Sequence, residues 1–138
     1  MPIDEAVQLV ERVRASAEQH AQLALEAVAA AVPSIVGIAL RKRPTLPMTI
    51  VERITDYRAR NVADWVMYRT AIASAAEKRG WPIDWYDAKT VCDSAGRALK
   101  VANFDAQFLQ LRKTLGPPWN TDHKLAMAAA VVLARALR

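Results

Sequence analysis

The sequence predicts a helix-rich α/β domain with a small, mainly parallel sheet. Apolar residues recur at three- and four-residue spacing along most of the 138 residues, as they do on the buried face of a helix. Two short runs rich in β-branched and aromatic residues, 34–40 and 83–87, interrupt this pattern and are typical of strands. A long helical segment lies between them, which is the crossover that parallel strands require. We therefore expect a single globular domain, 1–138, with two or three short strands.

Composition narrows the class of protein. Hydrophobic residues make up 53% of the chain and charged residues 24%, which excludes intrinsic disorder. The longest apolar run, Leu125 to Ala134, is well short of the roughly 20 residues that span a bilayer. The start of the chain carries acids rather than an export signal, and the single cysteine, Cys92, rules out an intrachain disulfide. We expect a cytoplasmic protein that does not associate with membranes.

The first element is predicted to be a long amphipathic helix over about residues 3–31. Asp4 and Glu5 in its first turn complement the helix dipole, and Pro33 ends it. One stripe of this helix is apolar: Ile3, Val7, Val10, Ala17, Ala21, Ala24 and Val28.

The run 34–40 is predicted to be a buried strand, and the loop that follows is strongly basic. The run is continuously apolar, which indicates cover on both faces, and Gly37 permits close backbone packing. Ligands of open α/β sheets bind beyond the carboxyl ends of strands, so Arg41, Lys42 and Arg43 are candidate anion-binding residues. The alternative is a solvated turn that keeps the protein soluble.

Residues 48–60 are ambiguous between a strand at 49–54 and a helix that begins near Thr49. Glu52 stands three residues after Thr49, which matches a capping box and favours the helix. This segment also carries Arg53, Arg58 and Arg60 around one tyrosine, a composition compatible with phosphate contacts and base stacking. The alternative is a surface of ion pairs between neighbouring helical turns.

The central helix is predicted from Asn61 to about Arg79. Gly80 is expected in a left-handed cap, and Pro82 prevents continuation of the helix. The strand at 83–87 follows. The apolar positions expected on the buried face of the helix are Val62, Trp65, Val66, Ile72, Ala75 and Ala76.

Three further helices are predicted after the second strand. The first covers residues 88–102, the second is capped by Asn103 or Asp105, and the third is capped by Asn120 or Thr121. The residues expected to be buried on the last two helices are Phe104, Phe108, Leu111, Leu115, Leu125, Ala129, Val132 and Ala136.

No catalytic signature stands out, so whether the protein is an enzyme stays open. Asp87 closes the second strand and Asp122 opens the last helix, and two such carboxylates are candidate ligands for Mg²⁺. The alternative is structural, with Asp87 capping the next helix and Asp122 complementing a helix dipole. Cys92 is predicted to be a small core residue rather than a nucleophile.

The order helix, strand, helix, strand and then helices ending in DHKLAMAAAVVLA resembles the second half of RNase H-like domains of the Holliday-junction resolvase type. The resemblance covers residues 34–138 and rests on element order. It implies that Asp122 is a metal-binding acid at the start of the last helix. The first three strands of that family have no counterpart before Ser34, so it implies at most a partial or degenerate domain.

Two functions remain in view. The net charge of +5 and the pI near 9.7 favour a nucleic-acid-associated domain that binds phosphates through its two basic segments. The alternative is a non-catalytic module that self-associates through its alanine-rich helices. A two-stranded sheet leaves open edges, so we expect a third strand at 49–54, a covering helix, or a partner chain such as a second copy.

Overall fold

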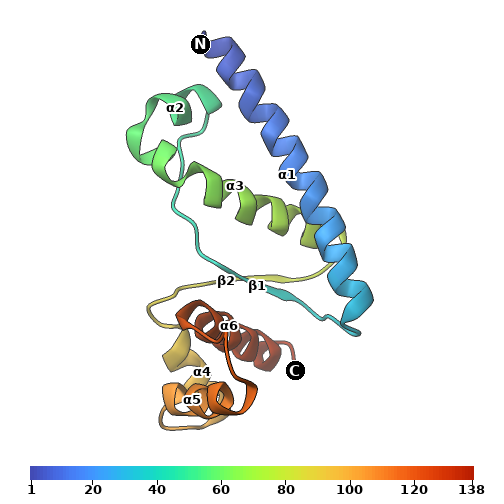
Figure 1. Ribbon diagram of the computed structural model, residues 1–138, viewed down its shortest axis with the longest axis vertical. Helices are drawn as coiled ribbons and strands as arrows, with labels where there is room; N and C mark the ends of the chain where they lie inside the picture. The colour runs from blue at the N-terminus through green and yellow to red at the C-terminus, as the bar shows by residue number, and fades with distance from the viewer. The chain divides into compact units, whose positions relative to one another are not determined.

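The computed structural model describes residues 1–138 and divides the chain into two compact units (Figure 1). The helical unit comprises residues 1–35 and 43–80, and the sheet unit comprises residues 36–42 and 81–138. The predicted α/β class, with a helical crossover between two parallel strands, is confirmed. The expectation that the whole chain is one domain stays a prediction.

The helical unit consists of α1 (Ile3–Ala31), α2 (Ile50–Thr55) and α3 (Tyr57–Lys78). The predicted extent of α1 is confirmed, with Asp4 and Glu5 in its first turn. Helix α1 contacts both α2 and α3, and Figure 1 shows α1 and α3 diverging toward the end of the unit where α2 lies.

The buried side of α1 differs from the prediction. Ala21 and Leu25 are buried, whereas Ala24 and Val28, which were expected on the same stripe, are exposed. A step of three residues turns a helix back by about 60°, while a step of four turns it forward by about 40°. The burial follows the four-residue step from Ala21 to Leu25, and Ala24 is turned away from it.

Residues 50–55 form a helix, which confirms the favoured interpretation and its capping box and excludes the alternative of a third strand at 49–54. The Thr49 hydroxyl accepts a hydrogen bond from the Glu52 amide at 3.2 Å, and the Thr49 amide donates to the Glu52 carboxylate at 3.0 Å. Two amides at the helix start are thereby satisfied locally, which favours the helix over an extended chain.

Helix α3 begins earlier than predicted because the Asp56 carboxylate accepts a hydrogen bond from the Ala59 amide at 2.7 Å. It ends as predicted: Gly80 has a left-handed φ of 73°, and its amide donates to the Glu77 carbonyl at 2.9 Å. The expected burial of Trp65 is wrong, because its side chain is 38% exposed. The buried residues of α3 are Ala59, Val66, Ala71, Ala73, Ala75 and Ala76.

The sheet unit contains β1 (Ile38–Arg41) and β2 (Ile83–Tyr86), which pair in parallel with Ile38 opposite Ile83. The first strand was predicted at 34–40, but Ser34 has a left-handed φ of 62°, which interrupts an extended chain there. The second strand stops at Tyr86, one residue short of the prediction.

Gly37, just before β1, allows the close packing that the sequence predicts. A Cβ atom at this position would lie 3.2 Å from side-chain carbons of Leu133 and Leu137 and from the Pro82 carbonyl oxygen. Contacts this short are rare for real Cβ atoms, so a larger residue would push β1 away from α6 (Thr121–Ala136).

The core of the sheet unit lies among α4 (Val91–Leu99), α5 (Phe104–Leu115) and α6. Helix α4 is shorter than the predicted 88–102 at both ends; at its C-terminal end Lys100 adopts a left-handed φ of 56°, which stops the helix at Leu99. The Phe108 and Trp119 rings meet edge to face, with centroids 5.7 Å apart. The buried core residues are Val91, Ala95, Phe104, Phe108, Ala128 and Ala129.

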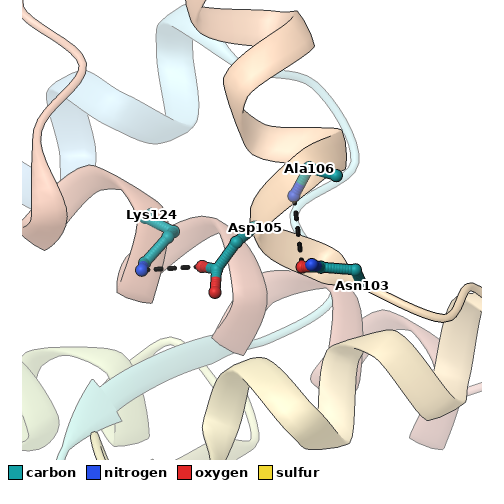
Figure 2. Close-up of polar contacts among 4 residues, drawn as sticks. All are labelled: Asn103, Asp105, Ala106 and Lys124. Atoms are coloured by element: carbon teal, nitrogen blue, oxygen red, sulfur yellow. Dashed lines mark hydrogen bonds and ion pairs between the residues drawn. The ribbon is translucent and has the colours of Figure 1, made fainter.

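Polar groups fix the ends of α5 and α6. The Asn103 carboxamide oxygen accepts from the Ala106 amide at 3.3 Å, and Asp105 forms an ion pair of 2.7 Å with Lys124 of α6 (Figure 2). Asn120 caps α6. The expected burial of Leu115 and Ala136 is wrong: both lie in the last turn of a helix and are exposed.

Candidate nucleic-acid interface

The six basic residues predicted to bind nucleic acid are divided between the two units. Arg41 is the exposed last residue of β1, and Lys42 follows it in the sheet unit, where its amide donates to the Tyr86 carbonyl at 2.9 Å. The other four, Arg43, Arg53, Arg58 and Arg60, belong to the helical unit. The structure therefore gathers four of the six within one compact unit.

Arg43 and Arg53 make hydrogen bonds that hold the helical unit together. The Arg43 guanidinium donates to the Thr70 hydroxyl at 2.7 Å, which attaches the segment after β1 to α3. Arg53 donates from Nε to the Pro47 carbonyl at 2.6 Å and from Nη2 to the Met48 carbonyl at 3.4 Å. These bonds fix the entry into α2, a structural role that the sequence did not indicate.

Arg58 and Arg60 lie in the first turn of α3, and both are exposed. The Arg60 guanidinium carbon is 5.9 Å from the centroid of the Tyr57 ring, within the range of a cation–π contact. Tyr57 itself is 70% exposed. A cation and an open aromatic face thus stand together at the start of this helix.

Two further aromatic residues of α3 are exposed, and the sequence-based prediction missed their arrangement. Trp65 is 38% exposed and Tyr68 is 55% exposed, while the Arg69 guanidinium carbon lies 4.4 Å from the centroid of the Trp65 ring. Tyr57 and Tyr68 are eleven residues apart, which is just over three full helical turns, so they share one side of α3. This spacing is visible in the sequence and could have identified the exposed aromatic side of the helix.

The predicted metal ligands, Asp87 and Asp122, both lie in the sheet unit. The Asp87 carboxylate accepts a hydrogen bond from the Lys89 amide at 2.8 Å, in a tight turn before α4, and Asp122 lies in the first turn of α6. No group of three or more His, Cys, Asp or Glu side chains is arranged to hold a metal ion. A Mg²⁺ site formed by this pair stays a prediction; it would raise the melting temperature of the wild type but not of Asp122→Asn.

Cys92 is half-buried against the core of the sheet unit, as expected for a small apolar residue. Burial raises the pKa of its thiol, and the nearby Lys124 ammonium offsets this only in part. The thiol is therefore protonated at neutral pH, a form that is a poor nucleophile.

Comparison of the chain with protein-family models, curated proteins and solved structures finds no match. The resemblance to RNase H-like domains therefore stays a prediction. None of the helices is both long enough and apolar enough to cross a membrane.

Proposed function

We propose that the chain binds single-stranded nucleic acid through one side of α3. The surface consists of the aromatic residues and arginines described above, and we name it the aromatic–arginine face: Tyr57, Arg58, Arg60, Trp65, Tyr68 and Arg69. Phosphate binding by the basic turn Arg41–Arg43 stays a separate prediction, because Arg41 and Lys42 belong to the sheet unit. The proposal concerns binding and includes no reaction.

The observation that carries the proposal is the exposure of three large aromatic side chains interleaved with arginines. Tyr57 and Tyr68 are more than half exposed, although the apolar rings of such residues are the ones that burial would stabilise most. Exposed rings beside guanidinium groups are what proteins use to stack on unpaired bases while cations contact the phosphates. Each stacked base contributes about 1 to 3 kcal/mol.

Single strands suit this surface better than duplex. The bases of a duplex are already stacked on each other, so its faces are not available to Tyr57, Trp65 or Tyr68. Arginine contacts to phosphate release counterions, which makes the affinity fall with salt at a log–log slope of about −0.7 per contact for a single strand.

The test measures binding of fluorescently labelled oligo-dT and oligo-U to the full chain over a series of salt concentrations. In the stacking variant, Tyr57→Ala with Tyr68→Ala, we expect the affinity to fall by about tenfold or more with little change of salt slope. In the charge variant, Arg58→Ser with Arg60→Ser, we expect the slope to weaken by about 1.4.

The matched control removes two exposed charges elsewhere, through Arg112→Ser with Lys113→Ser on α5. This control should retain most of the wild-type affinity. Replacing Arg41, Lys42 and Arg43 together by Ser should weaken the slope by up to about 2. Equal losses in all charge variants would show that only net charge matters, and absence of wild-type binding at moderate salt would refute the proposal.

A second candidate function, self-association through α1, rests on a different observation. Leu9, Val13 and Leu23 of α1 are 42%, 43% and 56% exposed. With Ser16 and His20 they form a row in which steps of four and three residues alternate, the spacing of helices that pair in coiled coils. A second copy of the chain would cover this row.

Sedimentation over a range of protein concentrations tests this candidate. We expect a dimer in the wild type that is lost in Val13→Glu with Leu23→Glu but kept in Gln8→Glu with Gln22→Glu, which adds the same charge on exposed polar positions of α1. A stable dimer without nucleic-acid affinity would favour the interaction module, and a monomer at all concentrations would contradict it.

A further inference from the structure

The helical unit contains an apolar cavity that the proposed nucleic-acid surface does not explain. It lies among α1, α2 and α3, is open to solvent, and has a volume of about 240 Å³. Its walls include Val10 of α1, Ile50 and Ile54 of α2, and Val66 and Met67 of α3. All of these residues belong to the one compact unit.

The cavity follows from how the three helices are packed. Figure 1 shows α1 and α3 diverging toward α2, and the α3 residues that face the gap include Ala63 and Ala71, whose small side chains do not fill it. The walls are aliphatic, and no aromatic side chain lines the cavity. Such walls suit a flexible hydrocarbon chain better than a flat ring that requires stacking.

The charged residues of the cavity identify the polar end of the ligand. Arg14 of α1, Arg53 of α2 and Arg60 of α3 line it, against a single acid, Glu18. Arg53 is already held by its bond to the Pro47 carbonyl, so its guanidinium is positioned before any ligand arrives. Pre-positioned guanidinium groups bind carboxylates with two parallel hydrogen bonds.

The excess of positive charge excludes amines, and the presence of Glu18 disfavours a doubly charged phosphate relative to a single carboxylate. The volume lies below the range of about 300 to 1,000 Å³ typical of pockets for drug-sized ligands, so the ligand is smaller than these. We propose that this cavity binds a medium-chain aliphatic monocarboxylate, with its hydrocarbon chain between the three helices and its carboxylate at the arginines.

Calorimetric titration of the full chain with octanoate, octanol and octylamine tests the proposal. We expect octanoate to bind with one molecule per chain. Octanol, which lacks the charge-assisted hydrogen bonds, and octylamine, whose ammonium group is repelled by the arginines, should each bind at least about tenfold more weakly. Arg14→Gln, which lies outside the aromatic–arginine face, should weaken octanoate by about tenfold and leave octanol unchanged.

A second variant tests the apolar part of the site. Ala63→Leu fills the cavity from α3 and should abolish octanoate binding, whereas Asn61→Leu, which adds a leucine at an exposed position of the same helix, should not. Circular dichroism checks that both variants are folded. If Ala63→Leu is not folded, the proposal is tested by Arg14→Gln alone, in which the ratio of octanoate to octanol affinity should fall.

Two results would overturn the inference: no octanoate binding at millimolar concentration, or equal affinity for octanoate and octanol. Arg60 belongs to both the cavity and the aromatic–arginine face, but Arg14 and Ala63 take no part in that face, so variants at these two positions test the cavity separately from the nucleic-acid proposal. Conversely, loss of oligonucleotide binding in Tyr57→Ala with Tyr68→Ala should leave the octanoate affinity unchanged.

Discussion

The two units bury different kinds of side chain. The core of the sheet unit is built around Phe104 and Phe108, with Trp119 packed against it. The buried residues of the helical unit are mostly alanines, joined by Leu25 and Val66: Ala21, Ala59, Ala71, Ala73, Ala75 and Ala76. Its own aromatic residues, Tyr57, Trp65 and Tyr68, remain on the surface.

This difference in buried side chains suggests that the aromatic residues stabilise one unit and serve binding in the other. A buried aromatic side chain removes about 150 to 250 Å² from water, so a few of them dominate the stability of a small core. Alanines contribute little area, but they allow helices to approach closely where they meet and leave a cavity where the helices diverge. The sheet unit thus uses its aromatics for folding, and the helical unit has them available for binding.

The largest expected effect is in the aromatic core. Phe108→Ala should lower the free energy of unfolding by about 3 to 5 kcal/mol, because it leaves a cavity and removes the ring contact with Trp119. Chemical denaturation measures the loss. The neighbouring Leu109→Ala, at a position that is 52% exposed, should change stability by less than about 0.5 kcal/mol. Similar losses in both variants would contradict this account of the core.

The corresponding test of the helical unit adds volume instead of removing it. Ala75 of α3 is 2% exposed and lines neither hollow beside α1, so Ala75→Leu should overpack the surroundings of α3 and cost about 1 to 3 kcal/mol. Hydrogen exchange should show the loss in the helical unit. Asn61→Leu, at an exposed position, is the control. A neutral Ala75→Leu would mean that the alanine contact is not tightly packed.

The end of α3 depends on backbone conformation alone. Nothing lies within 4 Å of a Cβ atom built at Gly80, so only its left-handed φ of 73° restricts the residue. Gly80→Val should lower the free energy of unfolding by about 1 to 2 kcal/mol. Gly80→Asn should lose less, since asparagine tolerates this conformation. An unchanged denaturation midpoint in Gly80→Val would show that α3 is stopped in another way.

In the sheet unit, the ion pair between Asp105 and Lys124 adds a smaller contribution. Asp105→Asn should cost about 0.2 to 1 kcal/mol at neutral pH, since the pair is partly exposed. The hydrogen bond from Lys124 to Asp105 raises the pKa of the lysine. Its contribution is therefore complete below the ordinary lysine pKa of about 10.4 and is lost as the pH rises through the raised value.

Thermal unfolding of wild type and Asp105→Asn across alkaline pH checks this. The difference between the two proteins should disappear in strongly alkaline solution. Asp93→Asn removes an acid of the same unit that forms no ion pair with Lys124 and is the control. A difference that persists after Lys124 has lost its proton would exclude the ion pair as its source.

The smallest effect is in the helical unit and has the opposite pH dependence. Two hydrogen bonds lower the pKa of Glu52: the one from the Thr49 amide has the larger effect, and the one from the Thr49 hydroxyl has the smaller. Its contribution to α2 is present above the ordinary glutamate pKa of about 4.3 and is lost as the pH falls through the lowered value. NMR signals of α2 should respond to acid in the wild type, while Glu52→Gln, which imitates the protonated side chain, should respond less. Equal responses would contradict the capping role.

The sequence by itself determined the features that depend on neighbouring residues. The capping box of Thr49 and Glu52, the stop at Gly80 and the cap at Asn120 were all predictable, because each rests on hydrogen bonds or backbone angles within a few residues. Residue type and spacing also sufficed for the parallel strands and their helical crossover.

Only the tertiary structure decided which side of each helix is covered. Trp65 was expected to be buried and is exposed, and so are Ala24 and Val28 of the predicted apolar stripe. An alanine-rich helix is apolar over most of its circumference, so its periodicity does not specify a single buried side. The hydrogen bond of Arg43 to Thr70, 27 residues further along the chain, and the cavity among three helices depend on how the segments pack. That packing requires contacts between residues far apart in the sequence, which no local pattern records.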